Sequence, residues 1–237
     1  MSSSNDPDVP LGGLPSNTGG EIIQAVARGA VSAVPFIGGP AAELLGLVLQ
    51  PALERRRGEW FEHLGRAFEE LRRRLDGFDP ARLATNELFI TAVITASNAA
   101  LRTHEAEKLD ALRNAVISSG LPMSPDEHTQ LMFIRLVDEL TALHLRLLAY
   151  LRDPEGWFTS RGIPKPNIIA GSRASVLEAA LPDLASDKVL YRQAVRELDA
   201  VGLAQDALSG MVTEQGLYVS LTTEFGNRFL AYITALS

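Results

Sequence analysis

SPDEHTQLMFIRLVDELTALHLRLLAYLRDP, residues 124–154, is the stretch that decides the fold class. Ser124 can cap a helix here, and Pro125 fits its first turn. Asp126 and Glu127 suit the positive end of the helix dipole. Apolar residues then recur every three or four positions in two neighbouring stripes, Leu136, Leu140, Leu143 and Leu147, and Phe133, Val137, His144 and Leu148. Because so wide an apolar face needs more than one partner helix, the stretch predicts a helical bundle.

Two further helices are predicted before this stretch. Over residues 53–75, apolar positions recur at spacings of three and four while Arg and Glu fill the other faces, which is typical of an amphipathic helix. Residues 86–118 predict another long helix with a break near Thr103 and His104. This helix carries small residues that let a neighbouring helix approach closely, namely Ala92, Ala96, Ala99 and Ala100.

An apolar run, residues 29–49, has Glu43 as its only charged residue. A cluster of helix breakers divides the run, namely Pro35, Gly38, Gly39 and Pro40. We therefore expect an apolar helical hairpin over 21–50, with Pro51 kinking or restarting the chain after it. Each helix is too short to cross a membrane, so a constitutive anchor is disfavoured. The four breakers and Glu43 form a candidate switch that could expose the hairpin to a membrane or a partner.

The two ends of the chain differ from the bundle in composition. Residues 1–19 are rich in Ser, Asn, Asp, Gly and Pro, which predicts a disordered arm. Residues 153–172 hold several Pro and Gly and are interpreted as a linker or a packed loop. Residues 173–237 predict two helices, a small hairpin around Gln215 and Gly216, and a closing helix. That order is typical of a winged-helix-like module.

The predicted fold class is therefore mainly α. An N-terminal apolar helical hairpin and a helical bundle together fill 20–152, and a small winged-helix-like α+β module follows the linker.

Composition excludes several function classes. The net charge of −7 and the pI near 5.2 argue against a general affinity for nucleic acid or anionic lipid. The absence of cysteine rules out disulfides, thiolate catalysis and Cys-ligated metal, and fits a cytoplasmic location. Phosphate-loop, dinucleotide-binding and GxSxG motifs are absent as well. We therefore predict no cofactor, no metal and no enzymatic activity.

Isolated polar groups do not change that prediction. Glu59 and His63 share a helix face, but an exposed ion pair explains them better than metal binding. His144 lies on an apolar stripe and is predicted to be a core histidine with satisfied hydrogen bonds. Asp138 and Glu139 are adjacent, so on a helix their carboxylates point about 100° apart and do not converge. The arginine clusters 55–57 and 72–74 are interspersed with Glu and predict a solvated, ion-paired face.

Three cations are a candidate phosphate or partner contact. Lys188, Arg192 and Arg196 recur every four residues, along one side of the would-be recognition helix. Acidic residues nevertheless outnumber basic ones in 172–237, which is unfavourable for binding phosphates. Nucleic acid is therefore the less favoured partner, and protein interaction or internal docking is preferred.

The chain also resembles a recurrent bacterial protein type and, in outline, the Abi-alpha abortive-infection group. The resemblance rests on the segments VPFIGGP, ALERRRGEWFEHL, EKLDALRNAVISSGLP, FIRLVDELTALHLRLLAYLRDP and LTTEFGNRFLAYI. It covers most of 29–237 and carries no catalytic motif. It implies a role in bacterial self-defence, and it assigns no functional residue.

Three functions remain open at this stage. The first is an interaction or assembly protein, as in phage defence or abortive infection, which binds a protein partner or self-assembles. The second is a membrane-active protein that exposes 22–49 on triggering. The third is a DNA-binding regulator that uses Lys188, Arg192 and Arg196.

Overall fold

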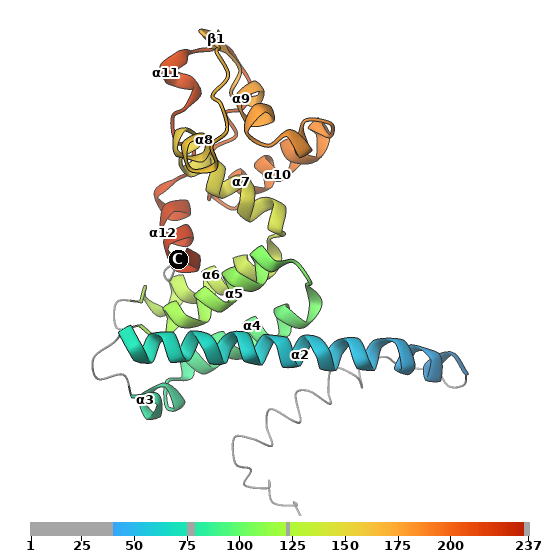
Figure 1. Cartoon of the computed structure of the whole chain (residues 1–237). Helices are drawn as coiled ribbons and strands as arrows, with labels where there is room; N and C mark the ends of the chain where they lie inside the picture. Colours follow the sequence, from blue (N-terminus) through green and yellow to red (C-terminus); the bar gives the residue numbers. More distant parts are fainter. Residues whose placement is uncertain (1–39, 75–78, 122–123, 235–237) are drawn as a thin grey trace, which may run out of the picture. The chain divides into compact units, whose positions relative to one another are not determined.

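The computed structural model describes residues 40–74, 79–121 and 124–234 (Figure 1). The chain divides into two compact units, 1–51 and 52–237. The described residues are mainly helical, which confirms the predicted helical character. In chain order the elements are α2 (Pro40–Arg74), α3 (Pro80–Ala84), α4 (Glu87–Arg102), α5 (Ala106–Ser119), α6 (Glu127–Glu139), α7 (Ala142–Arg152), α8 (Pro154–Arg161), β1 (Ala170–Gly171), α9 (Arg173–Ala180), the 3-10 helix η1 (Pro182–Leu184), α10 (Lys188–Ala200), β2 (Val212–Thr213), α11 (Glu214–Leu217) and α12 (Glu224–Thr234).

Helix α2 is continuous through Pro51, so the predicted restart at that residue is wrong, and the alternative of a kink stays a prediction. Pro51 removes one backbone donor, but Leu47, four residues earlier, is 68% exposed, so water can serve its carbonyl. The described part of the helix begins at Pro40. The first helix and the turn of the predicted hairpin lie outside the described residues, and so does the predicted arm 1–19.

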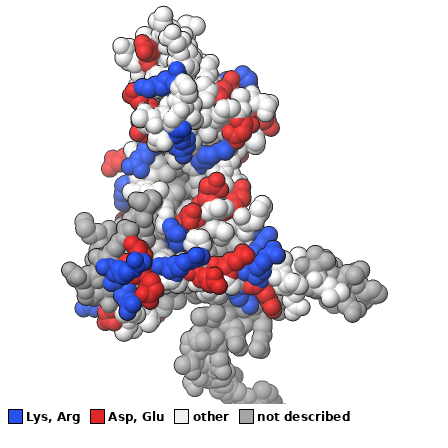
Figure 2. Space-filling view, in the orientation of Figure 1, with Lys and Arg blue, Asp and Glu red and all other residues white. Residues whose placement is uncertain are grey.

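The amphipathic character of 53–74 is confirmed. Trp60, Leu64 and Ala67 are buried at helical spacing, and Trp60 Nε1 donates a 2.9 Å hydrogen bond to Ser97 Oγ of α4. The polar faces of α2 carry interspersed Lys or Arg and Asp or Glu side chains (Figure 2). The small residues predicted on α4 are all buried, where α4 packs against α5 and α6.

The break predicted near Thr103 and His104 separates α4 from α5. The start of α6 differs from the prediction, because Asp126 rather than Ser124 caps it, accepting from Thr129 N at 3.1 Å. Ser124 Oγ is used elsewhere, as it donates to the Leu121 carbonyl at 2.6 Å. Ser124 therefore fixes the turn before α6, and Asp126 supplies the acceptor that caps the helix.

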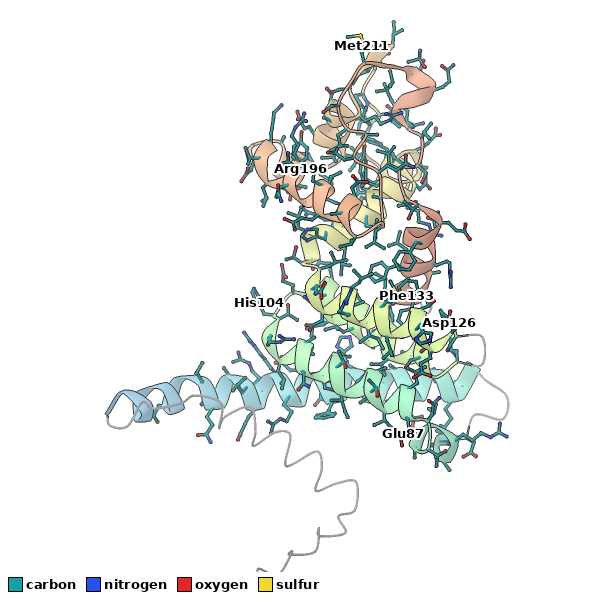
Figure 3. The ribbon with its side chains drawn as sticks, turned by 180° about the vertical axis from the view of Figure 1, so that it is seen from behind. Glu87, His104, Asp126, Phe133, Arg196 and Met211 are labelled. Atoms are coloured by element: carbon teal, nitrogen blue, oxygen red, sulfur yellow. The ribbon has the colours of Figure 1, made fainter. Side chains whose placement is uncertain are left out.

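The opening stretch forms two helices, which meet at Leu140. Lys108 Nζ donates to the carbonyls of Asp138 and Leu140, each at 2.8 Å, and so satisfies backbone acceptors where α6 ends. Thr141 and His144 then form a capping box that starts α7. Phe133 lies on α6 beside α12, where its ring centre is 5.2–5.5 Å from those of Phe225, Phe229 and Tyr232 (Figure 3).

The C-terminal part differs from its predicted pattern at two places. Residues 154–161 form helix α8 inside the segment interpreted as a linker or packed loop. The hairpin expected around Gln215 and Gly216 is also wrong, because 214–217 form α11. Strand β2 pairs instead with β1, antiparallel, with Ala170 opposite Thr213. The reason is that β1, which precedes α9, supplies the partner strand. Residues after Thr213 are therefore not needed for a second strand and can form a helix.

Helices α9, α10 and α12 are present where helices were predicted. An isolated antiparallel bridge joins Ala204 to Thr222 ahead of α12. The division of the chain into a bundle, a linker and a C-terminal module stays a prediction. Across the described ranges, no helix has both the length and the apolar character needed to cross a membrane.

Candidate functional site

The three cations predicted as phosphate or partner contacts lie along α10, and each has a local partner. Lys188 Nζ is 2.9 Å from Glu178 Oε2, Arg192 donates to Ser209 Oγ at 3.1 Å, and Arg196, labelled in Figure 3, donates to Gln193 at 3.0 Å. Their use as contacts stays a prediction. Lys188 would have to leave an ion pair in order to bind a phosphate.

The candidate hairpin switch falls mostly outside the description. Pro35, Gly38 and Gly39 lie outside the described residues. Pro40 is the first residue of α2, and Glu43 lies in the same helix. The switch therefore stays a prediction.

The histidines occupy structural positions. His144 is 8% exposed, accepts from Thr141 through Nδ1, and places Nε2 2.9 Å from Glu197 Oε2. This confirms the prediction of a core histidine with satisfied hydrogen bonds. Hydrogen bonds from Gln193 and His144 hold the pKa of Glu197 below its ordinary value.

The predicted ion pair between Glu59 and His63 is wrong in its partners. Glu59 pairs with Arg55 at 3.8 Å, whereas His63 Nε2 is 3.2 Å from Asp110 Oδ1, because α5 brings that carboxylate to α2. In the part of the chain that the structure describes, no group of three or more His, Cys, Asp or Glu side chains could hold a metal ion.

Several of the other charged groups singled out in the sequence form ion pairs. Asp138 lies 2.6 Å from Arg102, and Glu139 lies 3.4 Å from Arg135. On α2, Arg72 and Arg73 pair with Glu69 and Glu70, as expected of a solvated, ion-paired face. These side chains stabilise helices and form no convergent acid–base site.

A further candidate site is a groove with one apolar hollow and one more polar hollow, which sequence reasoning did not predict. Two adjoining hollows of about 470 and 500 Å³ share the residues Ala149, Trp157 and Arg161. We call the two hollows together the Trp157 groove. Its apolar lining is supplied by α7, α8, the turn after α9, and α12, through Leu145, Ala149, Trp157, Leu181, Leu230 and Ile233.

Helix α8 positions the centre of the groove. Asp153 caps the helix by accepting from Gly156 N at 2.8 Å, Pro154 occupies its first turn, and Gly162 ends it with φ of 63°. Trp157 and Arg161 are four residues apart and therefore lie on the same helix face. The Arg161 Cζ atom lies 3.3 Å from the centre of the Trp157 ring.

The Trp157 ring is fixed on its other sides. Its indole Nε1 donates to the Ala180 carbonyl at 3.4 Å. The Tyr150 ring meets it edge to face, with ring centres 5.9 Å apart, and burial raises the pKa of the Tyr150 phenol. The ring is only 7% exposed, yet it lines both hollows.

The α12 wall is held by buried hydrogen bonds from α5. Asn114 Nδ2 donates to the Ile233 carbonyl at 2.8 Å, and Ser118 Oγ donates to the Tyr232 carbonyl at 2.6 Å. Ile233 and Leu230 of α12 line the groove. These bonds hold the α12 wall, and the contacts of Trp157 with Ala180 and Tyr150 hold the α8 wall.

The rim of the groove is acidic on the α5 side and carries arginines on the α7 and α8 sides. Glu107 and Asp110 of α5 are acidic, and Asp110 is paired with His63 and Arg113. Arg146 of α7 is paired with Asp183 at 2.5 Å. Arg161 forms no ion pair within the described ranges. The groove can therefore bind apolar side chains and can also receive a negative charge on its α8 side.

A sequence signal for part of this site was present. Asp153, Pro154 and Glu155 are a typical helix start, and Gly162 is a typical stop, so DPEGWFTSRG could have been assigned as a helix. That assignment would have placed Trp157 and Arg161 on one face. The contribution of Leu145, Leu230 and Ile233 could not be predicted, because tertiary packing brings their helices together.

Comparison of the chain with family models, with curated proteins and with solved structures finds no match. The resemblance to the Abi-alpha group therefore stays a prediction.

Proposed function

We propose that the chain is a non-enzymatic interaction protein that binds an apolar segment of a protein partner in the Trp157 groove. The observation that carries the proposal is the meeting of two hollows at Ala149, Trp157 and Arg161. Apolar pockets with a few polar groups at the rim are typical of binding sites. The resemblance to the Abi-alpha group would make the partner a component of phage defence or abortive infection.

The fixed side chains of the groove favour its use as a binding site. Trp157 is a large, rigid side chain held by Ala180 and Tyr150. Aromatic residues in preformed hollows are the usual centres of interface binding energy. A wall that is already ordered has little conformational entropy left to lose when a partner binds.

A matched pair of substitutions tests this proposal. Ala149 is exposed and lines both hollows, so Ala149→Glu fills the groove without disturbing the core. Ala200 is an exposed residue at the end of α10, and Ala200→Glu is the control. Peptides would be selected by display on the full-length protein and then rebound to both variants.

The peptides that support the proposal bind the wild type and Ala200→Glu but lose binding to Ala149→Glu. A selection in which no peptide distinguishes the two variants overturns it. Binding would be read from tryptophan emission in a Trp60→Phe background. The chain has two tryptophans, so this change leaves Trp157 as the only one.

Binding to a membrane surface is a second candidate, favoured by the start of α2. Leu47 and Leu49 are 68% and 48% exposed there, and Arg55, Arg56 and Arg57 follow one to two turns later. An exposed apolar segment beside cations suits an anionic lipid surface. Leu47→Asp with Leu49→Asp should abolish flotation with phosphatidylglycerol vesicles, whereas Leu131→Asp on α6 should not. Equal flotation of the two variants would exclude this candidate.

Winged-helix-like architecture for 173–237, with DNA binding through α10, is the weakest candidate. The succession of α9, α10 and α12 is compatible with it. The ion pair of Lys188 with Glu178 and the net charge of −7 oppose it. A shift of duplex DNA at low salt that is lost in Arg192→Ala and Arg196→Ala would support it.

A further inference from the structure

Arg161 is the cation of the Trp157 groove that has no carboxylate partner. Two cations line the groove in the described part of the chain, Arg146 and Arg161. Arg146 is neutralised by Asp183 at 2.5 Å. Within the described residues, Arg161 lies 3.3 Å from the centre of the Trp157 ring and donates a long hydrogen bond of 3.4 Å to Ser160 Oγ. Its charge is therefore available to a ligand.

The stacking of Arg161 sets the direction of its donors. A Cζ atom 3.3 Å from the centre of the Trp157 ring is at van der Waals contact, which requires the guanidinium plane to lie over the ring face. The N–H groups of a guanidinium lie in its plane, so they point along the ring surface rather than into it. A guanidinium held in this way presents two parallel donors, which match the two oxygens of a carboxylate.

The surroundings of Arg161 combine this charge with apolar surface. Ala149 and Trp157 line both hollows with it, and Leu145 and Leu181 lie deeper in the first hollow. In the first hollow, a ligand on Arg161 therefore lies beside apolar surface, whereas the second hollow adds the polar residues Thr159 and Ser160. A free phosphate or a nucleic-acid backbone lacks apolar groups for the first hollow.

The remaining carboxylates restrict where a negative charge can sit. Glu107 and Asp110 belong to the α5 wall and would repel a ligand carboxylate placed near them. Asp153, at the second hollow, keeps its charge while it caps Gly156 N, but it lies at the opposite end of α8 from Arg161, about two helical turns away. The α8 side, at Arg161, is therefore the favourable location for a carboxylate, and a bound segment has a preferred orientation.

We infer that the Trp157 groove binds a protein segment in which an Asp or Glu side chain lies beside apolar residues, with the carboxylate on Arg161 and the apolar side chains in the two hollows. The inference rests on the proposed function and specifies its ligand. Arg161 acts as a specificity residue, since the hollows alone would accept any apolar segment.

The test uses the full-length protein and the same random peptide display. Selections are run in parallel on the wild type, Arg161→Gln and Arg161→Lys, and each is counter-selected on Ala149→Glu. Peptides from the wild type should be enriched in Asp or Glu next to apolar residues. The enrichment should disappear on Arg161→Gln and weaken on Arg161→Lys, which keeps the charge but loses the planar donor pair.

A double-mutant cycle with one selected peptide measures the contribution of the carboxylate to the affinity. The peptide is synthesised with its Glu and with Gln in the same position, and both forms are titrated against the wild type and Arg161→Gln by emission of Trp157 in the Trp60→Phe background. The Glu form should bind the wild type about 10-fold more tightly than the Gln form, and the two should bind Arg161→Gln alike. Thermal unfolding of each variant reports whether the exposed substitution leaves the fold intact.

The outcomes separate this inference from the proposed function. Peptides that are sensitive to Ala149→Glu but show no acidic preference overturn the role of Arg161 and leave the interaction groove standing. An acidic preference that persists on Arg161→Gln also overturns that role. Absence of any peptide sensitive to Ala149→Glu overturns both.

Discussion

Tyr191 donates a 2.7 Å hydrogen bond from its buried phenol to Glu178 Oε1, and this bond joins α10 to α9. Lys188 lies 2.9 Å from the other carboxylate oxygen. Burial opposes ionisation of Glu178, but the hydrogen bonds from Tyr191 and Lys188 outweigh it and hold the pKa of the carboxyl below its ordinary value of 4.5. Glu178 therefore fixes the helix that carries the three predicted contact cations.

The lowered pKa of Glu178 predicts a pH dependence of stability. Because the carboxylate is favoured in the folded state, its contribution is present above pH 4.5 and is lost as the pH falls through the folded-state pKa. Glu178→Gln should lower the free energy of unfolding by about 1 kcal/mol at pH 7 and by much less at pH 3. Urea unfolding at the two pH values measures the difference. Asp206→Asn, at an exposed loop position, is the control. If Glu178→Gln lowered the free energy of unfolding equally at pH 7 and pH 3, the lowered pKa of Glu178 would be contradicted.

Among the described glycines, Gly226 has the closest contact that an added Cβ atom would make. A Cβ atom there would lie 1.9 Å from the carbonyl oxygen of Leu203, so α12 could not keep its position. Gly226→Ala should destabilise the protein by about 3 kcal/mol. Gly65→Ala is the matched control, because nothing lies within 4 Å of its Cβ in α2, and better helix propensity should stabilise it by up to about 1 kcal/mol. Denaturant unfolding compares the two, and equal effects would refute the close contact.

Removal of the Asn114 side chain should loosen the α12 wall of the groove. Asn114→Ala removes the bond to the Ile233 carbonyl and leaves a buried acceptor without its donor, which should cost about 2 kcal/mol. Amide hydrogen exchange should accelerate in α12 more than in α4. Asn98→Ala, at an exposed position of α4, should change neither helix. Unchanged exchange in α12 of Asn114→Ala would show that the bond does not hold the wall.

Local sequence patterns predicted much of the helical structure because helical periodicity is a local property. The buried positions Trp60 and Leu64 repeat within one helix, and the break near Thr103 is marked by the residues around it. Asp126 rather than Ser124 caps α6, and Ser124 bonds to the turn that precedes the helix. Two suitable caps so close together cannot be ranked from sequence.

The pairing of strands and the groove depended on tertiary contacts. Val212 and Thr213 have a strand partner in β1, far away in the sequence, so the hairpin pattern that follows them was misleading. The Trp157 groove likewise needs Ile233 of α12 beside Trp157 of α8, and α5 holds α12 there through Asn114. The helices that line the groove had local sequence signals, but their packing against one another did not.

The most direct test of the interaction groove is the affinity of one selected peptide for three forms of the Trp60→Phe protein, read from Trp157 emission. The unsubstituted form and Ala200→Glu should bind the peptide equally, and Ala149→Glu should bind it at least 10-fold more weakly, because its side chain occupies the junction of the two hollows. Equal affinity of all three forms would contradict the claim that the Trp157 groove is the binding site.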